Sequence, residues 1–115
     1  HNRATFKQLI TACALVRVDE SGWFVPKDIE APFSSIMGEH RKVEGFNDNL
    51  KDFATEKRGH ILQQRGTERN FRFRFTEPAM QPYVLMRGIE AGFINEEAKS
   101  ALSSPEQPDL FSTAR

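Results

Sequence analysis

Hydrophobic and polar residues alternate most regularly in the second half of the chain. Phe71, Phe73 and Phe75 occupy every second position there, and Arg72 and Arg74 stand between them. Because successive side chains of a β-strand point to opposite faces, this pattern predicts a strand with its rings in the core and its guanidinium groups outside.

A partner strand is expected immediately upstream. Residues 61–64 are connected to the arginine-rich strand by the glycine-containing segment Arg65-Gly66-Thr67-Glu68-Arg69. Connections of this length and composition are typical of β-hairpins. We therefore predict a hairpin over residues 59–75 with arginines at its tip and on its outer face.

Apolar residues recur at helical spacing in three segments before the hairpin. We expect a first helix over residues 5–16, a second that starts at Pro26 and becomes regular near Glu30, and a third over residues 43–57. Pro32 fits the second helix only in its first turn or at a kink, and Gly38 should end that helix. The apolar positions are Phe6, Leu9, Ile10, Cys13 and Ala14 in the first helix, Ile29, Phe33, Ile36 and Met37 in the second, and Phe46, Leu50, Phe53 and Ala54 in the third.

Shorter elements complete the predicted chain path. Residues 23–25 follow a turn and should form a short strand that pairs with the hairpin and places Trp23 against its phenylalanine face. Thr76 is expected to cap a fourth helix that runs to about Gly92. Asn95 is expected to cap a short last helix, which a tail follows.

The predicted element order is helix, strand, helix, helix, strand, wing, strand, helix. This is the order of a winged helix-turn-helix, an α+β fold in which the hairpin is the wing. A chain of 115 residues is long enough for one such domain. We assign residues 1–94 to the domain and residues 95–115 to the short helix and tail.

Charge is spread unevenly along a chain whose formal net charge is zero. Residues 57–74 hold six basic residues against Glu68 alone, and residues 90–109 hold five acidic residues against Lys99 alone. Such asymmetry suggests one surface that faces an anion and another that repels anions. An ordinary solvated surface is the alternative.

The third helix carries the side chains that would read DNA in a helix-turn-helix protein, where the later helix enters the major groove. Asn47 and Asn49 suit adenine, and Lys51 can donate to guanine. Four acidic residues lie on the same helix and oppose phosphate: Glu44, Asp48, Asp52 and Glu56. A helix face that is solvated or contacts a protein is therefore the alternative.

Arginines of the hairpin, together with Lys57 before it, form the stronger candidate interface. Arg65 and Arg69 flank the tip, where they could enter a minor groove or contact phosphates. Arg72 and Arg74 project from one strand face at a spacing of about 7 Å. Four arginine–phosphate contacts would make log affinity fall with log salt at a slope of about −3 to −4. Alternatively, Arg72 and Arg74 pair with acidic residues of another domain.

Little in the sequence supports catalysis or membrane insertion. Cys13 is the only cysteine and is expected to be a small buried hydrophobe, and His40 and His60 lack partners at metal-ligand spacing. We see no glycine-rich phosphate loop, and no apolar run approaches the roughly 20 residues that span a bilayer. We predict a binding module without cofactor or metal. Because the chain starts without Met, we expect it to be a piece of a longer cytoplasmic protein.

A family resemblance covers nearly all of residues 5–94. The segments TACALVRVDESGWF, PFSSIMG, FNDNLKDF and GHILQQRGT, followed by RNFRFRFTEPAMQPYVLMRGIEAGFI, resemble the C-terminal winged-helix region of bacterial AAA+ ATPases. These ATPases are distant relatives of the archaeal and eukaryotic origin-recognition initiators. The resemblance implies an upstream ATPase module that this domain guides to DNA or to a partner. It also implies that the third helix and residues 65–74 touch duplex DNA, although the acidic third helix departs from a strongly basic recognition helix.

The tail contains a second motif, Gln107-Pro108-Asp109-Leu110-Phe111. It is similar to the pentapeptide that bacterial polymerases and repair proteins insert into the sliding clamp. In that comparison Leu110 and Phe111 are the apolar anchors and Gln107 is the polar latch. A tail folded back onto its own domain is the alternative.

The sequence thus favours a DNA-binding winged-helix module at the C-terminus of a larger ATPase. Its expected partners are duplex DNA, the sliding clamp and the ATPase domain of the same chain, with no membrane. The alternative is a winged helix that mediates protein interaction or oligomerisation and does not bind DNA.

Overall fold

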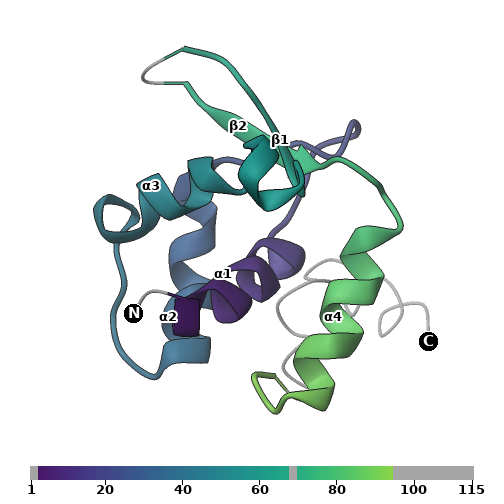
Figure 1. Cartoon of the computed structure of the whole chain (residues 1–115). Coiled ribbons are helices and arrows are strands. Elements are labelled where there is room, and N and C mark those ends of the chain that lie inside the picture. The colour runs from purple at the N-terminus through teal and green to yellow at the C-terminus, as the bar shows by residue number, and fades with distance from the viewer. Residues whose placement is uncertain (1–2, 68–69, 95–115) are drawn as a thin grey trace, which may run out of the picture.

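Four α-helices and one antiparallel hairpin are present in residues 3–67 and 70–94, the part of the chain that this computed structural model describes. Helices α1, α2 and α3 pack together, the hairpin projects beyond them, and α4 lies beside α1 (Figure 1). The predicted α+β class is confirmed. The elements are α1 (Arg3–Leu15), the 3-10 helix η1 (Pro26–Ile29), α2 (Glu30–Met37), α3 (Val43–Asp52), the 3-10 helix η2 (Glu56–Arg58), β1 (Leu62–Arg65), β2 (Arg72–Phe75) and α4 (Met80–Glu90).

The hairpin forms where the alternating sequence predicts it. Strands β1 and β2 are antiparallel, with Leu62 opposite Phe75 at one end and Arg65 opposite Arg72 at the other. The short strand expected at residues 23–25 is reduced to a single β-bridge between Phe24 and Phe73. Two backbone hydrogen bonds of 2.8 and 2.9 Å form that bridge.

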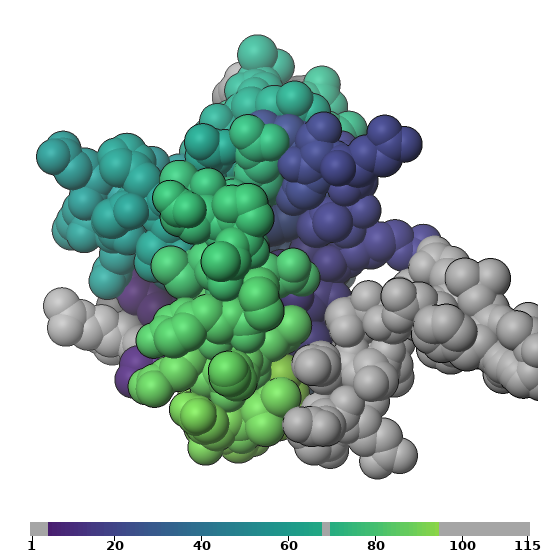
Figure 2. Space-filling view, turned by 90° about the vertical axis from the view of Figure 1, so that its right-hand side faces the viewer, coloured from purple at the N-terminus to yellow at the C-terminus, as the bar shows by residue number. Residues whose placement is uncertain are grey.

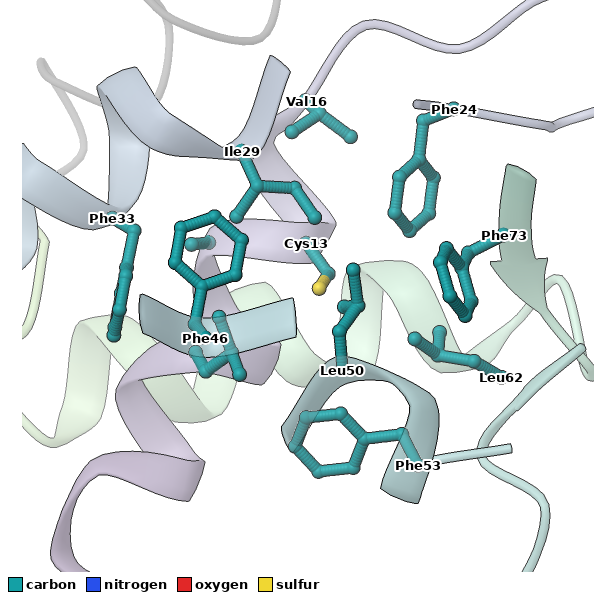
Figure 3. Close-up of a cluster of buried hydrophobic side chains, with 12 residues drawn as sticks. Cys13, Val16, Phe24, Ile29, Phe33, Phe46, Leu50, Phe53, Leu62 and Phe73 are labelled. Carbon is teal, nitrogen blue, oxygen red and sulfur yellow. The ribbon is translucent and has the colours of Figure 1, made fainter. Parts of the chain in front are cut away.

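The aromatic side of β2 enters the core, as the alternation predicts. Phe73 is fully buried, and Phe71 and Phe75 are partly buried against the same core. Phe73 lies near Phe24 and Leu62, beside side chains from the helices (Figure 3). The sheet is therefore anchored to the helices through its phenylalanine face, and the opposite face of β2 points away from the core.

Side chains of α2 fix the start of α3. Gly38 ends α2 in the left-handed conformation, with φ 76°, as the sequence predicts. Ser34 Oγ accepts the backbone N–H of Arg41 at 2.8 Å, and Glu30 Oε2 accepts the N–H of Val43 at 2.7 Å. Lys42, the N-cap residue of α3, supplies no side-chain acceptor, so Glu30 serves as a long-range cap.

The predicted extent of α3 is wrong at its C-terminal end. The helix ends at Asp52, not near Lys57, and residues 53–55 form a turn before η2. The carbonyl of Phe53 accepts the N–H of Leu62 from β1, and Thr55 adopts an extended conformation. The hydrogen bond from Leu62 thus occupies the Phe53 carbonyl, which would otherwise accept an N–H of the next helical turn.

The predicted cap of the fourth helix is also wrong. Thr76 donates its hydroxyl to the His60 carbonyl and its N–H to the Ile61 carbonyl, so it is tied to the start of β1. Helix α4 starts at Met80, without a side-chain cap. The helix expected after Asn95 lies outside the described residues.

Candidate nucleic-acid interface

The outward face of the hairpin collects polar side chains from both strands. Residues directly opposite in an antiparallel pair share a face, and alternation places Gln63, Arg65, Arg72 and Arg74 on the face opposite Phe73. We call these four residues the outer face of the hairpin. It contains three of the four arginines that the sequence singles out.

Trp23 lies with these arginines, which corrects the prediction that it joins the phenylalanine face. The Cζ atoms of Arg65 and Arg74 lie 4.3 and 4.5 Å from the centroid of the Trp23 ring. The reason is the pairing register, because Phe24 occupies the position opposite Phe73 and its neighbour Trp23 must point the other way. We call this group the Arg65–Trp23–Arg74 cluster.

Hydrogen bonds hold the Arg74 side chain in place. Its Nε donates to Oε1 of Gln63 at 2.7 Å, and an Nη donates to the Ser21 carbonyl at 3.1 Å. Together with the contact to Trp23, these bonds tie the hairpin to the turn before Phe24. The orientation of the Arg74 guanidinium group is therefore fixed by its neighbours.

The turn that carries Trp23 is itself anchored by Asp19. The Asp19 carboxylate accepts the backbone N–H groups of Ser21 at 2.8 Å and Trp23 at 2.9 Å. The hydrogen bond from Trp23 is the main cause that lowers the pKa of Asp19, and the charge of Arg65 acts in the same direction. The backbone position of Trp23 is thus set locally.

Arg65 and Arg72 form a like-charge pair at the tip end of the sheet. They are directly opposite in the register, and both side chains are exposed. Four carboxylates of the described residues form ion pairs, and their partners are Lys27, Arg41, Arg58 and Arg87 and not the arginines of the hairpin. Asp19 is the acidic group whose charge interacts with Arg65. Two arginines at directly opposite positions of a sheet are a natural place for a further anion.

Helix α3 presents a less favourable surface. Asn47, Asn49 and Lys51 are half-buried, and Lys51 Nζ lies 4.6 Å from the centroid of the Phe71 ring. Helical periodicity places Asn47 and Lys51 on one flank and Asn49 on the other. The exposed positions of α3 are Glu44, Gly45 and Asp48, so its outermost surface is acidic.

The remaining predicted contact residues have different positions. Lys57 is exposed on η2, but its neighbour Arg58 is directed inward, 4.0 Å from the Phe6 ring centroid and 3.5 Å from a carboxylate oxygen of Asp52. Arg69 lies outside the described residues. So do the three proposed clamp-binding residues, Gln107, Leu110 and Phe111.

Other reactive groups are few in the described part of the chain. Cys13 is buried as expected, and burial raises the pKa of its thiol. Residues 3–67 and 70–94 contain no group of three or more His, Cys, Asp or Glu that could hold a metal ion. Within the same ranges, no helix is long and apolar enough to cross a membrane.

Sequence reasoning missed two members of the interface, Trp23 and Gln63. Neighbouring residues of a strand point to opposite faces, so pairing Phe24 with Phe73 would have placed Trp23 on the outer face. That pairing is a long-range contact, and no local signal specifies it.

Comparisons of this chain with protein-family models, curated proteins and solved structures found no match.

Proposed function

We propose that this chain is a winged-helix module that binds duplex DNA, with the β1–β2 hairpin as its wing. Helices α2 and α3 would form the helix-turn-helix, and the Phe24 bridge would be the remnant of the third strand. Support comes from the element order and from the short connection that Ser34 and Glu30 hold between α2 and α3. In this proposal the module serves a larger ATPase, as the family resemblance implies.

The observation that carries the proposal is the opposed pair of Arg65 and Arg72. Like charges directly opposite on a sheet destabilise it, and cross-strand pairs are worth about 0.2–1 kcal/mol. A phosphate between or beside the two guanidinium groups would turn this repulsion into charge-assisted hydrogen bonds. The arrangement therefore suits a ligand better than it suits the stability of the hairpin.

Phosphate contact is the role that the charges favour. The outer face of the hairpin offers cations, whereas the outermost positions of α3 are Glu44 and Asp48. Acidic side chains repel phosphates, so α3 would add little to affinity. Contacts to phosphates position a protein without reading sequence, and we expect binding that depends weakly on DNA sequence.

Replacement of one arginine tests this directly. Arg72→Gln keeps a polar side chain but removes its charge, so it should weaken binding to a labelled random duplex several-fold in fluorescence anisotropy. Because it also removes the repulsion with Arg65, the free energy of unfolding should stay the same or rise.

A matched control comes from α4, where Arg87 is exposed and lies 3.6 Å from Glu90. Arg87→Gln makes the same change of net charge on another element and should leave affinity nearly unchanged. Equal affinities of Arg72→Gln and wild-type protein would refute the proposed role of the hairpin.

A second candidate function, protein interaction, is favoured by the surface of α4. Tyr83 and Met86 lie three positions apart on this helix and are 55% and 56% exposed. Helix α4 runs along the side of the molecule that Figure 2 shows. If the wild-type protein fails to bind duplex but forms dimers in sedimentation equilibrium that Met86→Glu disrupts, this second function replaces the first.

A further inference from the structure

We infer that Trp23 is a positioning residue that orients Arg65 and Arg74 for contact with phosphate groups of DNA. The inference rests on the proposed function and adds to it a residue that does not itself touch the ligand. Its basis is the Arg65–Trp23–Arg74 cluster, in which two cations from different strands share one indole ring.

Stacking on an aromatic ring suits arginine chemistry. The guanidinium group is planar and presents its five N–H donors at its edge, so a ring that covers one face leaves these donors available. Arg74 uses Nε and one Nη for Gln63 and Ser21. The donors that remain on Arg74, and those of Arg65, can therefore still bind phosphate oxygens.

The shared ring also brings the two cations close together. Each Cζ lies within 4.5 Å of the same ring centroid, so the two carbons are separated by at most twice that distance. A free arginine side chain carries about 2 kcal/mol of rotamer entropy, part of which is lost when it binds. Stacking in the unbound protein removes part of this loss in advance, which is preorganisation of the site.

Trp23 is unsuited to direct contact with bases. The residue is only 9% exposed, and two arginines lie against its ring. Asp19 fixes its backbone through the N–H bond of 2.9 Å. The ring thus works as a platform for arginines and not as a stacking partner for nucleotides.

Two variants separate a positioning role from a purely structural one. Trp23→Leu removes the platform but no charge, so affinity for a random duplex should fall about five- to thirtyfold, the equivalent of two cation–π contacts. The slope of log affinity against log salt should stay unchanged, because the same cations still meet phosphates. Trp23→Phe keeps a smaller aromatic face and should recover part of the affinity.

Fluorescence of the wild-type protein provides a readout that needs no variant. Trp23 is the only tryptophan of the chain, so its emission reports on this cluster alone. Titration with unlabelled random duplex should change the emission with the midpoint that anisotropy gives.

Three results would overturn the inference: wild-type affinity in Trp23→Leu, a flattened salt slope in that variant, or an unchanged Trp23 emission on binding. A wild-type protein that does not bind duplex at all would refute the proposed function as well. The failure of the inference and the failure of the function are therefore told apart by the wild-type titration.

Discussion

Gly88 allows α1 and α4 to approach closely. A Cβ atom at this position would lie 2.8 Å from Cγ2 of Thr11, which is buried in α1. The Thr11 hydroxyl donates to the Lys7 carbonyl at 2.7 Å, so the side chain is held and cannot easily move away. The size of a single residue thus controls the contact between the two helices.

Gly88→Ala should consequently lower the free energy of unfolding by about 1–3 kcal/mol, the usual cost of overpacking. The matched control is Gly45→Ala in α3, where a Cβ atom would meet nothing within 4 Å. Since Ala is the better helix former, that variant should be more stable by up to about 1 kcal/mol. Urea unfolding monitored by circular dichroism measures both, and a Gly88→Ala protein as stable as wild type would contradict the packing argument.

Individual residues also show how far sequence alone can lead. The burial of Phe73 and the exposure of Arg72 follow from a period of two, which is a local property. The environment of Trp23 does not, because it depends on Phe24 pairing with a residue far along the chain. The candidate interface was therefore half predictable: its arginines are visible in the pattern, whereas the ring that organises two of them is not.

At the scale of elements, α3 depends on α2 for its N-terminal cap. Glu30 accepts the Val43 N–H and lies 3.5 Å from Lys27 Nζ. The hydrogen bond from Val43 is the main cause that lowers the pKa of Glu30, with the Lys27 charge as a smaller one. A carboxylate in α2 therefore stabilises the start of the helix that follows it.

Glu30→Gln should lower the free energy of unfolding by about 0.5–1 kcal/mol, as loss of a charged cap does. Glu90→Gln, which breaks only a surface ion pair of 3.6 Å, is the control and should change stability less. Chemical denaturation at neutral pH compares the two, and equal effects would rule out the cap.

The same carboxylate should make stability depend on pH. Because the pKa of Glu30 is lowered in the folded state, the carboxylate takes up a proton at higher pH in the unfolded chain than in the folded protein. The stabilising contribution of Glu30 is complete above the ordinary Glu pKa of about 4.3. It is lost as the pH falls through the pKa that Glu30 has in the folded protein. Unfolding free energy between pH 5 and 3 should fall less steeply in Glu30→Gln than in wild type, and equal slopes would contradict this assignment.

Element boundaries were predictable only where a local signal sets them. Gly38 ends α2 through its left-handed conformation, which a glycine in that position suggests. The end of α3 and the start of α4 depend instead on hydrogen bonds in and next to the sheet, from Leu62 to Phe53 and from Thr76 to His60. Such bonds connect elements whose relative positions the sequence pattern does not contain.

At the scale of the whole molecule, the net charge is zero, but basic and acidic side chains lie on different parts of the surface. The hairpin that carries Arg65, Arg72 and Arg74 projects beyond the helices (Figure 1), whereas Glu44 and Asp48 form the exposed surface of α3. An anionic partner would therefore be attracted to the hairpin and repelled by much of α3. This distribution favours contact through the hairpin and an affinity that falls as salt rises.

The most direct test of the central claim is a salt titration of binding to a random duplex, measured by fluorescence anisotropy. The account predicts that wild-type affinity falls steeply with salt and that the double variant Arg65→Gln with Arg72→Gln binds more weakly, with a slope shallower by about 2. A wild-type protein that does not bind duplex at low salt, or a double variant with the wild-type slope, would contradict it.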